Sequence, residues 1–328
     1  MNGPIIIVGV PRSGTSLLTA VLNRHAKVYI SPESHFFFRI WGNRRILGNL
    51  SKPSNFDKLK PYFQSLKYIG SGWANTDIDI SRLKEKFYQE EKQDYESLFI
   101  TFLKILSEQK NKEMFGEKTP LHLYFLPQMV KSFKDIKIIH VIRDGRGTVS
   151  SLLGTDWGKD LITYSIFWKN CMTLIRHFMS VNALEMLEIK FEDLVVQPEN
   201  TLNKICDYIN VNFTDSLMDV IYSNTSSKSA KSSYKKGFDE TAITRWKTNL
   251  SAEQIAMVES IMHPELSAFG YDLTSDKGSL KRGFGIDQVN IKKVYQPFRT
   301  AVLRRLCQVG AVSRFNPDYS VSIKNLQA

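Results

Sequence analysis

The segment GVPRSGTS, residues 9–16, directly follows the apolar run PIIIV and constrains the fold more than any other stretch. A short apolar strand, a turn with glycines and a helix form a unit that binds anions, because backbone N–H groups of the turn and of the helix N-terminus point at the ligand. The helix is expected from Gly14, since apolar residues recur on one face at Leu17, Leu18, Val21 and Leu22. The segment therefore predicts an α/β fold with a phosphate site at its first turn.

This loop departs from the nucleotide-binding pattern GxxxxGK[ST] at one position, because Thr15 stands where the lysine would be. In P-loop NTPases that lysine reaches the β- and γ-phosphates, and the next hydroxyl holds Mg²⁺. Arg12 supplies a positive charge within the loop, and Thr15 and Ser16 supply hydroxyl donors. Three interpretations stay open: a P-loop kinase or NTPase with an incomplete site, a loop for another phosphate ligand, and a turn without a ligand.

The composition indicates a folded protein with an anionic partner. Hydrophobic residues make up 42% of the 328 residues, and 44 Lys and Arg against 33 Asp and Glu give a net charge of +11. A nucleic-acid-binding protein is disfavoured, since its charge would form a stripe with interleaved aromatic residues, whereas here the charge gathers at turns after strands. The sequence shows no signal pattern, no apolar run of ~18 residues, and no metal or disulfide spacing. We therefore expect a cytoplasmic protein without a structural metal, although a native anchor upstream stays an open alternative.

Apolar runs typical of strands alternate with helical patterns along most of the chain. Strands are expected at 4–8, 28–30, 136–142 and 187–191, and 115–120 is expected to be a short strand or a loop. Helical patterns dominate 36–112, 121–133, the residues from 145, 159–181, 199–209, 214–222 and 241–271, and the polar segment 223–240 is expected to be a loop. This alternation predicts a single large α/β domain over residues 1–273, with a mainly parallel sheet flanked by helices on both faces. Residues 274–328 are expected to form a basic C-terminal extension.

A second cationic site is expected in HVIRDGRGTVSS, residues 140–151. Arg143 follows a buried strand, at the end where ligands of open α/β sheets bind. Ser151 lies two helical turns later, so that the two residues would bracket a second phosphate. The alternative is a surface turn in which Asp144 caps the helix and pairs with Arg143 or Arg146.

The polar loop 223–240 contributes a third group of cations. Lysines alternate with serines along it, and Arg245 and Trp246 follow closely. Such a loop would close over a bound nucleotide. The alternative is a solvated loop that binds nothing.

Five motifs, in this order and at this spacing, resemble those of the PAPS-dependent sulfotransferases: GVPRSGTS, GEKTP, VIRDGRGTVSS, FEDLVVQPENTL and KKGFDETAITRWK. The similarity covers roughly residues 4–272 and looks closest to the tyrosylprotein and heparan-type branches and to bacterial relatives. It implies a P-loop-like fold, 3′-phosphoadenosine-5′-phosphosulfate (PAPS) as donor, 3′,5′-ADP (PAP) as product, and no metal ion. It also explains the missing lysine, since PAPS has no γ-phosphate and its transfer needs no Mg²⁺.

The resemblance further implies which residues bind the donor. The 5′-phosphosulfate would be held by Arg12, Ser13, Gly14, Thr15 and Ser16. The 3′-phosphate would be held by Arg143 and Ser151, and the nucleotide would be covered by Ser232, Lys235, Lys236 and Arg245. Family members often begin the FEDL motif with Tyr, where this chain has Phe191, so any hydroxyl contact from that position is lost.

Sulfuryl transfer needs a base for the acceptor proton, cations for the leaving phosphate, and in-line geometry. By resemblance Glu33 is the catalytic base, and His35 matches a histidine of the heparan-type pattern ExHFF; Phe38 replaces the Asp that commonly continues it. Alternate residues of an extended chain share a face, so Glu33 and His35 are expected to point at one acceptor. Lys118, in GEKTP, would stabilise the charge that builds on the bridging oxygen. The alternatives are a salt-bridge carboxylate at Glu33, a histidine without a catalytic role at His35, and a surface lysine at Lys118.

These residues predict a sulfotransferase that moves a sulfuryl group from PAPS to a hydroxyl or an amine, with Glu33 as the base. The acceptor is expected to be a carbohydrate or a small metabolite, with a protein tyrosine as the alternative and a P-loop kinase or NTPase as the alternative of another class. No nucleic-acid partner is expected, and the oligomeric state is open. The extension 274–328 would either contact an anionic membrane surface or be a solvated or oligomer-packing tail, the favoured alternative.

Overall fold

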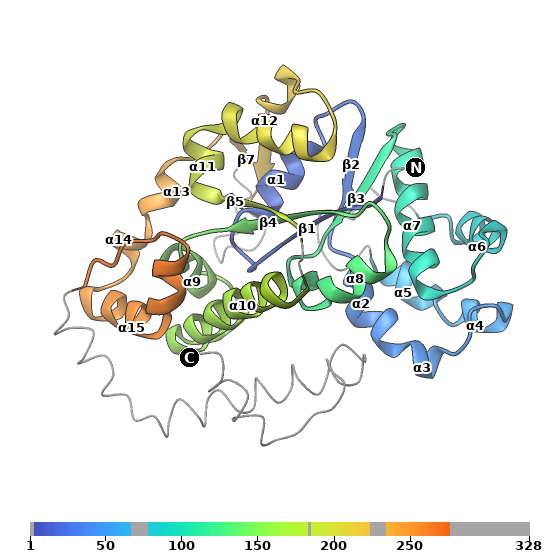
Figure 1. Ribbon diagram of the computed structural model, residues 1–328, viewed down its shortest axis with the longest axis horizontal. Coiled ribbons are helices and arrows are strands. Elements are labelled where there is room, and N and C mark those ends of the chain that lie inside the picture. The colour runs from blue at the N-terminus through green and yellow to red at the C-terminus, as the bar shows by residue number, and fades with distance from the viewer. Residues whose placement is uncertain (1–2, 67–77, 183–184, 224–233, 276–328) are drawn as a thin grey trace.

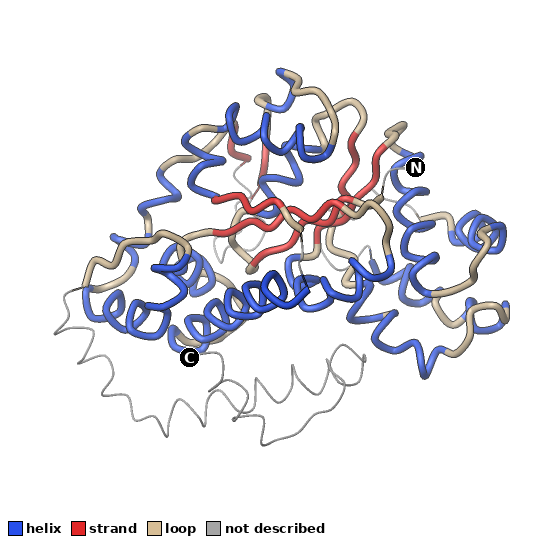
Figure 2. Tube along the Cα trace, in the orientation of Figure 1, coloured by secondary structure: helices blue, strands red, loops and turns tan. Residues whose placement is uncertain are grey.

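The computed structural model describes residues 3–66, 78–182, 185–223 and 234–275. Its centre is a five-stranded sheet with the spatial order β2-β3-β1-β4-β5, in which every neighbouring pair is parallel (Figures 1 and 2). The strands are β1 (Ile5–Gly9), β2 (Val28–Ser31), β3 (Met114–Lys118), β4 (Lys137–Ile142) and β5 (Leu187–Lys190). The predicted parallel sheet is confirmed, and the carboxyl ends of all five strands lie at one edge.

Helices cover both faces of this sheet, as predicted (Figure 1). β1 is buried throughout, and its alternate residues enter two separate hydrophobic clusters, Ile5 and Ile7 on one face and Ile6 and Val8 on the other. The first face is covered by α1 (Thr15–Leu22), α11 (Phe191–Val196) and α12 (Pro198–Ile209). The second face is covered by α7 (Tyr95–Gln109), α8 (Leu126–Ser132), α9 (Gly145–Leu153), α10 (Leu161–Asn182) and α15 (Ala252–Ala268). Burial on both faces is the reason the strands are apolar runs rather than alternating patterns.

The stretch 36–112 is mostly helical where the structure describes it, as the sequence predicts. A 3₁₀ turn at Trp41–Asn43 interrupts it, and its helices are α2 (Phe36–Arg39), α3 (Arg44–Leu47), α4 (Pro53–Asp57), α5 (Lys60–Ser65), α6 (Ile80–Gln89) and α7. Asp79 and Asp94 cap α6 and α7 by accepting hydrogen bonds from backbone N–H groups of the first turn. The short helices α2, α4 and α5 place aromatic side chains in the hydrophobic cluster on the second face of the sheet.

The prediction of a helix near 214–222 is wrong. The segment forms a 3₁₀ turn at Asp215–Leu217 and then the strand β6 (Ile221–Ser223), which pairs antiparallel with β7 (Tyr234–Lys236). The predicted loop 223–240 therefore begins at the last residue of β6 and includes β7. Short apolar runs are compatible with either a helix or a strand, and Ile and Tyr favour strands once a pairing partner is present.

The C-terminal part of the domain is helical, as predicted, but divided into three helices: α13 (Thr241–Thr244), α14 (Trp246–Asn249) and α15. The Glu259 carboxylate on α15 accepts hydrogen bonds from Thr274 N, Thr274 Oγ1 and Ser275 N, which ties residues up to Ser275 to the domain. The boundary at 273 stays a prediction, because 276–328 lie outside the described residues. Within the described ranges, no helix combines the length and the apolar character needed to cross a bilayer.

Candidate active site

The loop after β1 is shaped to bring backbone close to an anion. Arg12 and Gly14 adopt left-handed conformations, with φ of 76° and 102°, and Ser13 N donates to Val10 O. Gly14 is the N-cap of α1 and supplies no side-chain cap to the helix. A Cβ at Gly14 would lie 2.4 Å from the ring of Phe191, so both the backbone conformation and the space require glycine.

One hydroxyl in this loop is buried without a hydrogen bond. Ser13 is only 1% exposed, and its Oγ has no partner among the described residues. Buried hydroxyls are nearly always hydrogen-bonded, because leaving one unpaired costs free energy. Thr15 is also buried, whereas Ser16 is exposed at the start of α1. The loop therefore fits a ligand that accepts hydrogen bonds, as a phosphate group does.

The second predicted phosphate site lies directly beside this loop. Arg143, after β4, donates to Arg12 O at 3.0 Å and to Ala242 O at 2.7 Å, and its guanidinium lies over the ring of Phe191 at 4.5 Å. Ser151, on α9, accepts from Arg12 Nε at 3.0 Å. The structure thus brings Arg12, Arg143 and Ser151 together.

These contacts refine two expectations. Arg12 contacts Ser151, a residue assigned to the 3′-phosphate, although Arg12 itself was assigned to the 5′-phosphosulfate. Phe191, which has no hydroxyl, supports the Arg143 guanidinium through its ring face instead. Burial lowers the pKa of both Arg12 and Arg143, and the neighbouring charge of Arg12 also acts to lower the pKa of Arg143. Two neighbouring, partly buried cations favour binding of a doubly charged anion.

The alternative interpretation of this turn is correct for Asp144 and Arg146. Asp144 caps α9 by accepting from Arg146 N, and it also holds the Arg146 guanidinium at 2.7 Å. Glu259 accepts from the other side of that guanidinium, and the ring of Trp246 lies 4.2 Å from it. Arg146 is therefore part of the buried framework, while Arg143 faces the phosphate loop.

The third group of cations is only partly described. Arg245 donates to Asp239 Oδ2 at 2.5 Å and to Thr241 Oγ1, and its charge also acts on Arg143, so it borders the site. Ser232 lies outside the described residues. Lys235 and Lys236 belong to β7, of which the structure describes the backbone and not the side chains. That these residues cover a nucleotide stays a prediction.

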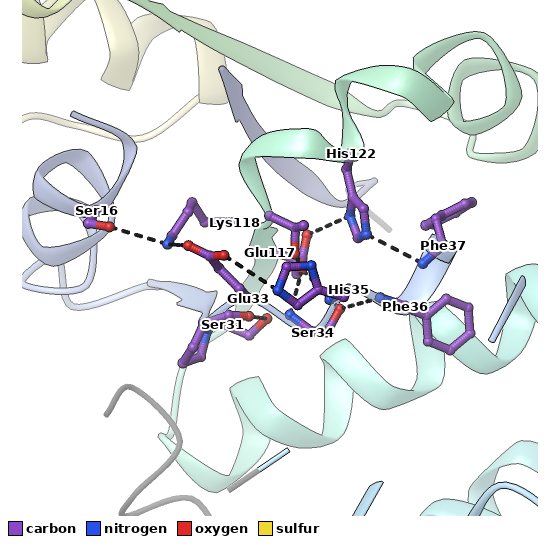
Figure 3. A network of polar contacts seen from close by, with 12 residues as sticks. Ser16, Ser31, Glu33, Ser34, His35, Phe36, Phe37, Glu117, Lys118 and His122 are labelled. Atoms are coloured by element: carbon purple, nitrogen blue, oxygen red, sulfur yellow. Dashed lines mark hydrogen bonds and ion pairs between the residues drawn. The ribbon is translucent and has the colours of Figure 1, made fainter. Parts of the chain in front are cut away.

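The three predicted catalytic residues lie together (Figure 3). Lys118, the last residue of β3, has its Nζ 2.5 Å from Glu33 Oε1 and 3.3 Å from Ser16 Oγ. Glu33 Oε2 is 3.6 Å from His35 Nε2. The lysine side chain is 8% exposed and that of Glu33 is 35% exposed, so the carboxylate is the more accessible member of the pair. A continuous set of polar contacts therefore runs from the phosphate loop to His35.

Glu33 and His35 lie together as predicted, but the predicted extended conformation of this segment is wrong at His35. His35 is not extended: it adopts a left-handed conformation, with φ of 53°, as the N-cap of α2. The turn, rather than alternation along a strand, brings its ring back to Glu33. Burial lowers the pKa of His35, and the carboxylate of Glu33 opposes this effect without overcoming it. The imidazole is therefore held toward its neutral form.

Sequence reasoning missed a buried polar network beside this centre. Glu117, the residue before Lys118, accepts hydrogen bonds from Ser34, Thr119 and His122. The motif GEKTP contains two of these residues, but only its lysine was assigned a role. A carboxylate inside a buried strand is the signal that would have identified Glu117, because buried charges are paired or hydrogen-bonded.

The arrangement supplies the parts that group transfer to an acceptor needs. It combines a loop for an anion, two partly buried arginines, a lysine at the strand end, and an accessible carboxylate beside that lysine. In the part of the chain that the structure describes, no group of three or more His, Cys, Asp or Glu is placed to bind a metal ion.

Comparison with known sequences places this geometry in a family. The model of the sulfotransferase family matches residues 4–215. Protein-tyrosine sulfotransferase A of Caenorhabditis elegans is 25% identical over 287 residues, which cover 82% of this chain and 67% of that protein. Protein-tyrosine sulfotransferase of Drosophila melanogaster is 24% identical over 287 residues, covering 82% of this chain and 51% of that protein. The chain thus spans about half to two thirds of the length of these relatives.

Solved structures show the same fold. The sulfotransferase domain from the Synechococcus PCC 7002 olefin synthase aligns with a TM-score of 0.56 at 20% identity, covering 83% of this chain and 97% of that domain. The sulfotransferase domain from the curacin biosynthetic pathway aligns with a TM-score of 0.54 at 21% identity, covering 83% and 99%. These alignments support the single α/β domain with its parallel sheet.

Proposed function

Because the chain belongs to the sulfotransferase family, we propose that it transfers the sulfuryl group of PAPS to an acceptor hydroxyl and releases PAP. The observation that carries this proposal is the contact of Lys118 with both Ser16 of the phosphate loop and the carboxylate of Glu33. A cation beside the donor phosphate and a base beside that cation are the two groups that in-line sulfuryl transfer requires.

The donor would bind through the two cationic turns at the carboxyl edge of the sheet. The N–H groups of the loop and the hydroxyls of Thr15 and Ser16 suit the 5′-phosphosulfate, as does the hydroxyl of Ser13, which has no partner among the described residues. Arg143 and Ser151 suit the 3′-phosphate, and Arg12 lies between the two groups. No γ-phosphate has to be held, so Thr15 in place of the Walker lysine is no defect, and the kinase or NTPase alternative loses its support.

In the transfer step Glu33 accepts the proton of the acceptor hydroxyl as the new oxygen–sulfur bond forms. The bond between sulfur and the bridging oxygen breaks, and its electron pair stays on the 5′-phosphate of PAP. Lys118 and the loop N–H groups stabilise that negative charge. His35, 3.6 Å from Glu33, orients the carboxylate and lines the acceptor side.

The acceptor is proposed to be a carbohydrate or a small metabolite. A tyrosine hydroxyl is the second candidate, and the observation in its favour is the similarity to protein-tyrosine sulfotransferases. A cytoplasmic location, and contact of the extension 274–328 with an anionic surface, also stay proposals that fractionation and vesicle binding would test.

Two measurements test the proposal. Thermal denaturation is followed with PAP, with ATP and Mg²⁺, and with a single-stranded oligonucleotide; stabilisation by PAP alone is expected, and a response only to ATP and Mg²⁺ would refute it. Radiolabelled PAPS is then incubated with an amino-sugar oligosaccharide, with 4-nitrophenol and with a tyrosine peptide. Label transferred to one class identifies the acceptor chemistry.

A further inference from the structure

Glu117 is the most thoroughly enclosed charged group near the reacting centre. It is 0% exposed on β3, where it pairs in register with Ile6 of β1 and Ser31 of β2. Because side chains alternate along a strand, Glu117 and Lys118 point to opposite faces of the sheet. Lys118 reaches Ser16 on α1, whereas Glu117 faces the segment that begins α2 (Figure 3).

Every hydrogen bond that the described contacts give Glu117 is donated to it. Its Oε1 accepts from Ser34 N at 3.0 Å, from Ser34 Oγ at 2.9 Å and from the hydroxyl of Thr119. Its Oε2 accepts from His122 Nδ1 at 3.0 Å. Burial acts to raise the pKa of Glu117, but His122 and these donated hydrogen bonds outweigh burial and hold the pKa below its usual value. The carboxylate is therefore ionised.

Three of its partners also receive a backbone hydrogen bond from the start of α2. Phe36 N donates to Ser34 Oγ at 3.1 Å, and His35 N donates to Thr119 Oγ1 at 3.3 Å. Phe37 N donates to His122 Nε2 at 3.4 Å, on the opposite side of the ring from the Nδ1 contact with Glu117.

Four consecutive backbone N–H groups, those of residues 34–37, therefore lead to one carboxylate, either directly or through a single side chain. Such N–H groups at a helix start have no partner within the helix. Each of the three intervening side chains, those of Ser34, Thr119 and His122, accepts a hydrogen bond from the backbone and contacts the Glu117 carboxylate.

We propose that Glu117 is a positioning residue that sets the Glu33 carboxylate against the Lys118 ammonium. Glu33 immediately precedes the anchored N–H groups, and Lys118 immediately follows Glu117 along the strand. The hydrogen bonds from residues 34–37 to Glu117 and its partners hold this segment against the second face of the sheet, and they thereby fix the backbone position of Glu33. Glu33 and Lys118 then meet on the first face, at 2.5 Å. The catalytic consequence rests on the proposed function.

The test compares Glu117→Gln with a matched control. Glutamine keeps the size of the side chain but turns an NH₂ group toward hydrogen-bond donors. The expected result is a kcat lower by about 10²-fold, the cost of a misplacement near 1 Å at a reacting group. The KM for PAPS and the Kd for PAP stay within two-fold of the native values, because the phosphate loop belongs to another strand.

The control is Glu188→Gln, which alters another carboxylate that binds a buried histidine in the same sheet. Glu188 Oε1 lies 2.9 Å from His140 Nδ1, and among the described hydrogen bonds and ion pairs neither residue is joined to residues 33–37. Its kcat is expected to stay near native. A folded Glu117→Gln protein that binds PAP and keeps its kcat within two-fold of native would overturn the proposal.

A second pair of variants tests the proposal if the Glu117→Gln protein does not fold. Thr119→Val removes one donor to the carboxylate, whereas Thr119→Ser keeps the hydroxyl. Loss of kcat in the valine variant, with recovery in the serine variant, supports positioning through Glu117. Equal kcat in both variants contradicts it.

Acetylation of Lys118 by an amine-reactive ester, followed by peptide mass spectrometry, needs neither donor nor acceptor. It should be faster in Glu117→Gln or Thr119→Val than in the native protein, because Glu33 no longer covers the ammonium. Unchanged labelling refutes the positioning role even if the native chain turns over no PAPS. Absent turnover in the native chain refutes only the proposed function.

Discussion

We predict that Ser13→Ala raises the stability of the ligand-free protein and weakens the binding of PAP. Ser13 is 1% exposed, and its Oγ has no hydrogen-bond partner among the described residues. An unpaired buried hydroxyl costs about 1–3 kcal/mol in proteins. Ser13→Ala removes this cost and breaks no protein hydrogen bond, so we expect the ligand-free protein to gain about 1 kcal/mol. For a domain of this size that gain corresponds to a Tm higher by about 2 °C.

The same substitution should weaken PAP binding. A hydrogen bond from a hydroxyl to a charged group contributes about 1.5–3 kcal/mol. Its loss raises the Kd for PAP roughly 10- to 150-fold. Thermal denaturation without ligand gives the first quantity, and isothermal titration with PAP gives the second.

Ser107→Ala is the matched control for this prediction. Ser107 is also buried, 2% exposed, but its Oγ donates to Lys112 O at 2.7 Å, far from the phosphate loop in the sequence and on a different helix. Its replacement should lower the Tm, because the carbonyl loses a donor, and should leave PAP binding unchanged. If Ser13→Ala lowers the Tm as this control does, or leaves the Kd for PAP unchanged, the inference that the Ser13 hydroxyl awaits a phosphate is wrong.

Three further predictions concern the loop and the reacting centre. Glu33→Ala should lower kcat by about 10²–10⁴-fold, the contribution of a general base, while PAP still raises the Tm; near-native turnover would remove Glu33 from the mechanism. Gly14→Ala should cost more stability than Gly158→Ala in urea unfolding. Both glycines have positive φ, but only at Gly14 does a Cβ also meet the ring of Phe191, at 2.4 Å; equal losses would contradict this steric reason. His35 has a pKa that burial lowers in the folded protein, so the unfolded chain binds more protons and stability falls as pH drops below about 6.5. Unfolding in urea at pH 7.5 and 5.5 should show a smaller difference for His35→Gln than for the native protein, and an equal difference would refute this assignment.

The parts of the fold that depend on local sequence were predictable. The parallel sheet follows from apolar runs that alternate with helical patterns, and the phosphate loop follows from two glycines between a strand and a helix. The segment 214–222 was not predictable in this way. Its strand β6 exists because β7 pairs with it, and a run of this length carries no period that separates a strand from a helix.

The contacts within the site depend on tertiary structure and could be predicted only in part. That Arg143 faces the loop while Asp144 holds Arg146 is decided by Glu259 and Trp246, which belong to helices about a hundred residues later in the chain. From the sequence both pairings were equally compatible with a capped helix. The hydrogen bond between Arg12 and Ser151, 139 positions apart, carries no local signal at all.

Glu117 differs from these residues because its importance was visible in the sequence. A parallel strand covered on both faces is normally an apolar run, and β3 breaks that rule at its last two positions. Adjacent residues of a strand point to opposite faces, so two adjacent charges oblige both covering layers to supply partners. One layer supplies Ser16 and Glu33, and the other supplies the start of α2 with His122. Two adjacent charged residues at the carboxyl end of a buried strand therefore predict one polar network on each face of the sheet. In this protein the network around Glu117 is proposed to position the network of Lys118 and Glu33.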